Sequence, residues 1–333
     1  MAVDFQLLND AGVLFSPREK SLIRKTLPQL KEQYKVKYIA YWGRIEGVTN
    51  DYHIIKAWDE YLGPKKFFYS NDCVDWVLVP EIDPRVEEFC KFEQGLFFGD
   101  PKKKIRFRDL TKLVRKDKSG EEGEEQAQPQ EEEEEEPPAE EEPNEEETEE
   151  EEEERLKRKA KKPSNFYTED KRIAVFLKGI ETTCALVPLG FLYLTATHIV
   201  DQNESWKGLT ETDSLKLSSY LHQRFPIDPI VRRNLEVKGI NKPHEFLDDA
   251  SKDEPVGTWS LQYNPHVSLV ILRSLVFPGF QLYLRPESSQ WGTSYVGNAL
   301  IHIDIPFALP AVPKEETQPK PLLDILKGNS KQD

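Results

Sequence analysis

The chain has 333 residues, of which 45 are basic and 60 are acidic, and aromatic residues make up 11% of it. This length suits one large domain or two small ones, and the aromatic content is enough for a sizeable core. The three cysteines lack CxxC spacing, which argues against a disulfide framework. The sequence has no apolar run of 18 residues that could span a membrane, and no N-terminal apolar stretch after basic residues that could be a signal peptide. We therefore expect a soluble intracellular protein.

The net charge of −15 comes from one segment of the chain. Residues 121–154 contain 22 Glu and no Lys or Arg, whereas the rest of the chain has 45 basic against 38 acidic residues. A segment this polar cannot bury enough apolar surface to offset its chain entropy. We therefore predict a disordered Glu-rich insertion at 119–162. A helix from about Glu145 to Lys162 is the alternative, because Glu and Lys are good helix formers.

The N-terminal region predicts a helix followed by short strands. Ser16 as N-cap, Pro17 at N1 and Glu19 at N3 have the form of a capping box. Apolar residues then recur at helical spacing as far as Tyr34, and Pro28 inside this pattern predicts a kink or two short helices. The next segments are rich in β-forming residues and favour antiparallel strands at 36–42, 52–58, 67–70, 76–79 and 96–98.

Strand-like sequence resumes after the insertion. We predict strands at 173–177 and within 184–194, and a second capping box at Thr210 and Asp213 with a short helix behind it as far as Leu221. Further segments separated by Pro-containing turns predict a three-stranded meander. They span 258–263, 267–276 and 280–284, and a last strand is expected at 295–296.

Both sides of the acidic segment show short antiparallel strands and few helices, without a βαβ alternation. We therefore predict an α+β fold: a single domain dominated by antiparallel β-sheet with a few short helices, interrupted by the long disordered acidic insertion. The domain is discontinuous and spans 1–118 and 163–310, with the insertion at 119–162 and a flexible C-terminal tail at 311–333. Two small domains joined by the acidic run are the alternative.

No sequence pattern predicts an active site. The six histidines lack HxxxH or HxxEH spacing and none has a cysteine within five residues, which argues against a local metal site. Gly-rich phosphate loops, a GxSxG elbow and an EF-hand loop do not occur in the sequence. The Glu-rich run would repel phosphate and no RNA-recognition motif is found, so nucleic-acid binding is not expected. We predict no catalytic, cofactor-binding or metal-binding residues and no cofactor.

Aromatic residues beside glycine and proline are the most distinctive feature of the remaining sequence. Two interpretations stay open: these side chains pack at the corners of a β-rich domain, or they are anchors at protein–protein interfaces. The candidate partner-interface residues are Trp42, Trp58, Trp206, Phe277 and Trp291.

Several short blocks carry a recognisable pattern: YWGRIEG at 41–47 with DYHI at 51–54, YSNDCVDW at 69–76, GLFFGDP at 95–101, LSSYLH at 217–222, GTWSLQ at 257–262, LRSLVFPG at 272–279 and YVG at 295–297. In their order and spacing, over about 36–100 and 170–307, these blocks resemble the radial spoke head family of ciliary proteins. The departures are His53, where a tyrosine is usual, Phe277, where a tryptophan is usual, and the Glu-rich insertion. The family's LSSY-x-H block lies on an expected helix.

The resemblance implies a non-catalytic structural subunit of the radial spoke head, located in the axoneme of motile cilia or flagella and cytoplasmic before assembly. Such a subunit would scaffold the head and help to transmit mechanical signals from the central pair to axonemal dyneins. The implied partners are spoke head 4/6-type proteins, other spoke proteins, a second copy of the chain and, transiently, central-pair projections, with no nucleic acid and no membrane. The alternatives are an acidic chaperone-like or interaction protein that binds basic partners through the Glu-rich segment, and an enzyme whose site is assembled from distant loops.

Overall fold

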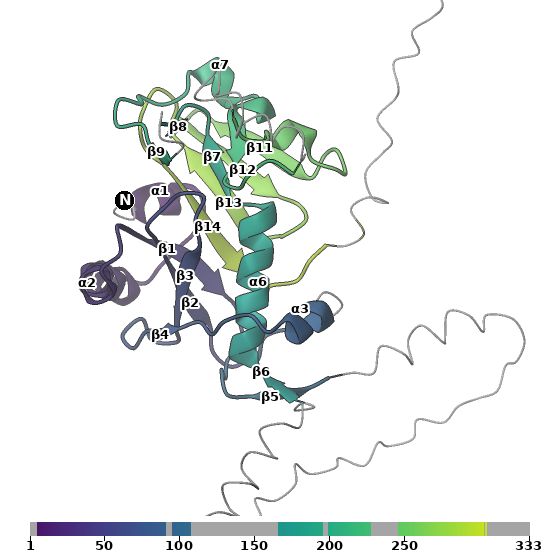
Figure 1. Cartoon of the computed structure of the whole chain (residues 1–333). Coiled ribbons are helices and arrows are strands. Elements are labelled where there is room, and N and C mark those ends of the chain that lie inside the picture. The colour runs from purple at the N-terminus through teal and green to yellow at the C-terminus, as the bar shows by residue number, and fades with distance from the viewer. Residues whose placement is uncertain are drawn as a thin grey trace, which may run out of the picture. The chain divides into compact units, whose positions relative to one another are not determined.

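The computed structural model describes residues 5–90, 95–107, 166–195, 199–227, 246–302 and 304. The Glu-rich insertion predicted at 119–162 and the tail predicted at 311–333 lie outside these residues. Eight strands share one sheet in the order β11-β12-β13-β14-β1-β2-β3-β4 (Figure 1). The strands β1 and β14 run parallel, whereas five other neighbouring pairs are antiparallel. The predicted α+β class dominated by antiparallel sheet is confirmed.

The elements are short apart from two helices. The helices are α1 (Phe5–Asp10), α2 (Pro17–Tyr34), α3 (Pro84–Cys90), α6 (Glu169–Thr183) and α7 (Glu211–Ser214), with 3-10 turns η1 (Leu217–Ser219) and η2 (Ala250–Lys252). The strands of the large sheet are β1 (Tyr38–Ile45), β2 (Tyr52–Trp58), β3 (Lys65–Ser70), β4 (Val77–Leu78), β11 (Trp259–Asn264), β12 (Leu269–Ser274), β13 (Phe280–Leu284) and β14 (Trp291–Gly297). Two-stranded sheets pair β5 (Lys104–Arg106) with β6 (Phe166–Thr168), β7 (Leu186–Pro188) with β10 (Tyr220–His222), and β8 (Leu192–Leu194) with β9 (Val200–Gln202).

Contacts between residues divide the chain into two compact units, which are described separately. Unit 1 comprises Met1–Phe5, Val13–Ala185 and Ser294–Ala299, and unit 2 comprises Gln6–Gly12, Leu186–Thr293 and Leu300–Asp333. The domain boundaries predicted from the sequence stay a prediction.

Helix α2 of unit 1 begins at the predicted capping box. The Ser16 hydroxyl accepts a hydrogen bond from the Glu19 amide at 3.2 Å, and the Glu19 carboxylate accepts one from the Ser16 amide at 2.6 Å. Pro28 lies inside the helix, which continues as one element to Tyr34, so the expected alternative of two short helices is wrong. The helix ends where Lys35 adopts a left-handed conformation.

The strand predicted at 173–177 is wrong, because this segment lies in helix α6. Ile173, Leu177 and Ile180 are spaced as i, i+4 and i+7, so they share one helical face, and all three are fully buried. The segment's β-branched and aromatic residues favoured a strand locally, and burial of this apolar face in the folded chain overrides that preference. Glu169 and Asp170 in the first turn complement the positive end of the helix dipole.

Unit 1 contains sequence from both sides of the predicted insertion. Strand β5 precedes the insertion and β6 follows it, and they pair with Arg106 opposite Phe166. Helix α3 packs against α6 across the same gap in sequence, around a small apolar cluster of Val86, Phe89 and Tyr167. The described segments that precede and follow the predicted insertion therefore meet at one pair of strands, whose backbones are about 5 Å apart.

Unit 2 contains the predicted three-stranded meander of β11, β12 and β13, which is confirmed. The short helix predicted behind Thr210 ends at Ser214, after four residues, and a 3-10 turn follows it. The Thr210 hydroxyl accepts a hydrogen bond from the Asp213 amide at 3.1 Å, so the predicted cap is present. Tyr220 and Leu221 lie in strand β10, which corrects the expected extent of this helix and the helix expected for the LSSYLH block. All three residues of β10 are buried, which fits a strand covered on both faces better than an amphipathic helix.

Candidate functional site

Helix α6 supplies two buried carboxylates to unit 1, Glu169 in its first turn and Glu181 in its last. At a rise of 1.5 Å per residue these groups lie about 18 Å apart along the helix. Figure 1 shows α6 running beside the strands β1, β2 and β3, which supply most of the partners of Glu181.

The Glu169 cluster joins the start of α6 to strand β2 and to the loop at 98–99. The Tyr52 hydroxyl donates to the Glu169 carboxylate at 2.9 Å, and the backbone amides of Phe98 and Gly99 donate to it at 3.0 and 2.8 Å. Glu169 and Tyr52 are both fully buried. Burial first, and then the charge of Glu169, raise the pKa of the Tyr52 phenol, so the hydroxyl stays a donor. Hydrogen bonds to an ionised acceptor are the stronger kind, so this cluster holds the loop firmly.

Arg172, one turn further along α6, holds the preceding residues of the same loop. Its guanidinium donates to the backbone carbonyls of Gly95 and Leu96 and lies 4.3 Å from the centre of the Phe97 ring. Phe97 is itself almost fully buried. The loop thus has its carbonyls, its amides and its central side chain all held by the first turns of α6.

Close backbone packing explains the glycines of the YWGRIEG and GLFFGDP blocks. Gly99 has a φ of +103°, and a Cβ there would lie 2.4 Å from the Asn50 carbonyl oxygen. A Cβ on Gly47 would lie 2.1 Å from the same oxygen. The two blocks meet directly, since Gly47 and Phe97 form a parallel bridge. Only glycine fits such an approach of backbone to backbone without a shift.

The Glu181 cluster joins the last turn of α6 to three strands. Glu181 accepts hydrogen bonds from the Trp42 indole at 2.9 Å, from the Lys56 ammonium at 3.1 Å and from the Lys65 ammonium at 2.6 Å. The two lysines and the glutamate each have side chains at most about 10% exposed. The Trp42 ring also stacks on Tyr295, so β14 is tied to the same cluster.

The cluster places two ammonium groups against one carboxylate. Burial lowers the pKa of Lys56 to about 8. The charge of Glu181 opposes this shift only in part, because the same carboxylate pairs with Lys65, whose charge lowers the Lys56 pKa further. Burial alone would raise the pKa of Glu181, but the two lysines together lower it to about 2. The carboxylate is thus firmly ionised at neutral pH. Because all three charged groups are nearly buried, the arrangement fastens three strands to a helix.

A third polar cluster lies in unit 2 and joins the LSSYLH and GTWSLQ blocks. His222 Nε2 lies 2.8 Å from the Asp253 carboxylate, which also accepts a hydrogen bond from the Trp259 indole at 2.7 Å. Burial alone would raise the pKa of Asp253, but the hydrogen bonds from His222 and Trp259 lower it. An ionised carboxylate only accepts, so His222 donates through Nε2. Among the described residues, none is a hydrogen-bond partner for the buried His222 Nδ1.

These buried clusters were missed from the sequence. Glu181 and Lys56 are 125 residues apart, and His222 and Asp253 are 31 residues apart, so no local sequence pattern predicts these pairs. The available signal was the aromatic residues: Trp42 and Trp259 each supply an indole N–H to a buried carboxylate.

The predicted partner-interface residues fall into two groups. Three of them are buried within the chain, namely Trp42, Trp58 and Phe277. The other two, Trp206 and Trp291, are partly exposed and lie together in unit 2, where both rings pack against Phe191 with centres 5.5 and 4.7 Å away. The structure therefore brings one pair of the five together, and their role at a partner interface stays a prediction.

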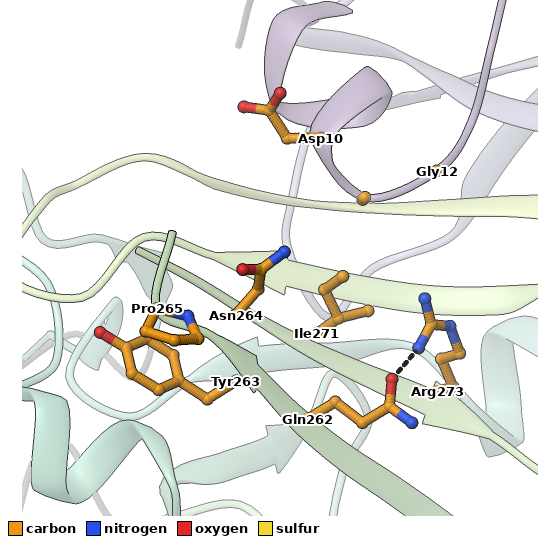
Figure 2. A pocket seen from close by; sticks show the side chains of 9 residues that line it. Asp10, Gly12, Gln262, Tyr263, Asn264, Pro265, Ile271 and Arg273 are labelled. Carbon is orange, nitrogen blue, oxygen red and sulfur yellow. Dashed lines mark hydrogen bonds between the residues drawn. The ribbon is translucent and has the colours of Figure 1, made fainter. Parts of the chain in front are cut away.

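An open groove of about 620 Å³ lies in unit 2 between the end of α1 and the hairpin of β11 and β12 (Figure 2). Its polar side chains are engaged with neighbours: Arg273 donates to Gln262, Asn264 accepts from the His266 amide, and Asp10 lies 3.8 Å from Arg285. Such a groove lacks the concave apolar lining with converging polar groups that is typical of ligand pockets. The lining residues are Asp10, Ala11, Gly12, Gln262, Tyr263, Asn264, Pro265, Ile271 and Arg273.

Among the residues that the structure describes, no group of three or more His, Cys, Asp or Glu side chains is arranged to hold a metal ion. The described helices include none that is long and apolar enough to cross a bilayer.

Comparison with known proteins finds similarity to one class, the radial spoke head proteins, although no family model matches the chain. The relatives are named radial spoke head protein 9 homolog. The protein from Bos taurus is 28% identical over 305 residues, which is 91% of this chain and 96% of the relative. The proteins from Homo sapiens (28% over 310 residues, 93% and 98%) and Danio rerio (29% over 300 residues, 90% and 94%) are similar to the same extent. The resemblance seen in the sequence blocks is confirmed over nearly the whole chain.

Proposed function

We propose that this protein is a non-catalytic structural subunit of the radial spoke head in the axoneme of motile cilia or flagella. The observation that carries the proposal is the similarity to radial spoke head protein 9 homologues over at least 90% of this chain and 94% of each of the three relatives described above. The sequence blocks that resemble the family build interior contacts: they supply Trp42 to one buried carboxylate, Phe98 and Gly99 to another, and His222 to a third.

A scaffolding role is supported by how unit 1 is fastened. Helix α6 is tied near both ends by buried carboxylates, through Glu169 to β2 and the loop at 98–99, and through Glu181 to β1, β2 and β3. A body held in this way moves as a unit when force is applied, because packed interiors have low compressibility. We propose that this rigidity helps the spoke head to pass mechanical signals from the central pair to axonemal dyneins.

The proposed partners are spoke head 4/6-type proteins and other spoke proteins, with a second copy of the chain and transient contacts to central-pair projections. Trp206 and Trp291 are the predicted interface residues that keep exposed surface, and partly exposed tryptophans are enriched at protein interfaces. The matched variants Trp206→Phe and Leu14→Ala both change an exposed or partly exposed apolar side chain. Only Trp206→Phe is expected to weaken recovery of spoke partners.

The experiment that tests the proposal is mass spectrometry of the proteins that co-purify with a tagged endogenous copy after salt extraction of isolated axonemes. Recovery together with spoke head 4/6-type proteins and spoke stalk proteins is the expected result. Fractionation as a free protein without spoke components would overturn the proposed location and favour the chaperone-like alternative.

A further inference from the structure

Three exposed apolar side chains form a patch on unit 1 next to the loop that α6 holds. Val48 is 64% exposed, Leu96 is 53% exposed and Phe98 is 37% exposed. We call these three residues the Phe98 patch. Exposed apolar residues are ordinary when scattered, but a contiguous group of them marks an interaction surface.

Backbone pairing shows that the three residues are contiguous. The Val48 amide donates to the Phe97 carbonyl at 2.8 Å, and the Thr49 amide donates to the Phe98 carbonyl at 2.9 Å. Gly47 and Phe97 form a parallel bridge, so Val48 lies beside Phe98 on the same face. Side chains alternate along an extended segment, so Phe97 points inward while Leu96 and Phe98 both point outward.

The patch is held rigid from behind. Glu169 binds the amides of Phe98 and Gly99, and Arg172 binds the carbonyls of Gly95 and Leu96. These are charge-assisted contacts from one helix to the backbone that carries the patch. A surface fixed in this way loses little conformational entropy when a partner docks, which favours affinity.

The side of the patch next to Phe98 is positively charged. The Lys103 ammonium lies 3.5 Å from the centre of the Phe98 ring, and Lys102, Lys104 and Arg106 nearby in sequence are exposed. Within the described part of the chain none of these four cations forms an ion pair. Asp100 is the exposed acid in the same stretch. A partner that covers the apolar centre must therefore bring negative charge to this side.

We propose that the Phe98 patch is a docking surface for a segment of another protein in which a large apolar side chain is flanked by carboxylates. The apolar side chain would cover Val48, Leu96 and Phe98, and the carboxylates would pair with the lysines. This surface goes beyond the proposed function and does not depend on it, because it is argued from exposure, rigidity and charge alone.

Charge and composition disfavour the other occupants. Two copies of this chain meeting face to face would bring two lysine rims together, and like charges repel. The chain's own residues 121–154 carry the right charge, but they contain no Val, Leu, Ile, Met, Phe, Tyr or Trp to cover the apolar centre. A nucleic-acid base would need an open aromatic face, and Lys103 lies over the ring of Phe98.

The test places a photo-reactive amino acid at Leu96 in the full-length tagged chain, expressed in ciliated cells that lack the native copy. A second chain carries the same group at Leu14, which is 72% exposed on a different segment, as the control for general surface labelling. Whole cells are irradiated and the cross-linked peptides are sequenced, so the result does not depend on where the chain resides. The expected product, specific to position 96, is a net acidic peptide of another protein that contains a large apolar residue.

Variants then test each part of the surface. Phe98→Ala is expected to lower the cross-linking yield roughly thirtyfold, the loss typical of a binding hot spot. Lys102→Glu with Lys104→Glu is expected to lower it roughly tenfold, whereas Lys25→Glu with Lys31→Glu on helix α2 leaves it unchanged. Thermal unfolding of each purified variant checks that the fold is kept.

Several outcomes would overturn the proposal. They are cross-links to residues 108–165 of the same chain, to a second copy, to lipid or to nucleic acid, a basic or purely polar peptide, or a yield at Leu96 no greater than at Leu14. Equal loss of yield in the two lysine double variants would also overturn it.

Discussion

Replacing Glu181 by glutamine should destabilise unit 1 strongly while leaving its packing volume almost unchanged. The carboxylate is the shared counterion of Lys56 and Lys65, at 3.1 and 2.6 Å, and all three side chains are nearly buried. A glutamine can still accept the Trp42 indole hydrogen bond, but it cannot neutralise two ammonium groups. The variant therefore isolates the effect of charge.

The pKa values give the size of the effect. The two lysines hold the Glu181 pKa at about 2 instead of its ordinary 4.5, which corresponds to about 3 kcal/mol in favour of the folded state. The Lys56 pKa falls from 10.5 to about 8, which corresponds to a cost of about the same size. Removing one partner of a buried ion pair typically costs about 3–5 kcal/mol, and we expect Glu181→Gln to lie in that range.

Urea denaturation followed by tryptophan fluorescence and by circular dichroism measures this loss. Glu87→Gln is the matched control. Glu87 of α3 pairs at 2.7 Å with Lys178 of α6, the helix that carries Glu181, and exposed pairs of this kind contribute less than about 1 kcal/mol. The triple variant Lys56→Met, Lys65→Met, Glu181→Leu should recover most of the stability, because it leaves no buried charge. A loss below about 1 kcal/mol for Glu181→Gln, or a triple variant as unstable as the single one, would refute the reasoning.

Three further predictions concern other parts of the structure. Burial, and then the charge of Arg44, lower the pKa of His53 below its ordinary 6.5 and so outweigh the opposing carboxylate of Glu19. His53 therefore binds a proton more readily in the unfolded chain, and the free energy of unfolding should fall as the pH drops below 6.5. In urea titrations between about pH 5 and 7.5, His53→Gln should make the free energy of unfolding less dependent on pH. Gly99→Ala should destabilise the fold by more than about 2 kcal/mol, because its Cβ would meet the Asn50 carbonyl. Gly179→Ala in helix α6 should stabilise it by about 0.5–1 kcal/mol, because a Cβ there meets nothing within 4 Å. Equal effects of the two variants in thermal unfolding would contradict the close packing at Gly99. Ser16→Ala should lower stability by about 1 kcal/mol through loss of the helix cap, and an unchanged urea midpoint would show that the cap contributes nothing.

Short-range sequence patterns predicted the helices and strands that are determined by residues close together in the chain. The capping box at Ser16 needs only three consecutive positions after it, and the meander from β11 to β13 follows from β-rich runs separated by turns. Helix α6 was missed because Val175 and Phe176 favour strands, although the spacing of Ile173, Leu177 and Ile180 already fitted a helix.

Contacts between distant parts of the chain could not be predicted. The parallel pairing of β1 with β14 joins Gly43 to Tyr295, and no short-range pattern sets that register. The partners of Glu181 come from strands that precede the Glu-rich insertion, while the glutamate follows it. The resemblance to the radial spoke head family supplied the functional expectation that the residues alone did not give.

Cryo-electron tomography of axonemes can show whether this protein is a structural part of the radial spoke head. Axonemes from cells that lack the protein would be compared with axonemes restored by a tagged copy. We expect the spoke head density to be lost or reduced without the protein, with the spoke stalk retained, and to return with the tag located in the head. Unchanged spoke heads in cells that lack the protein would show that it is not a structural part of the spoke head.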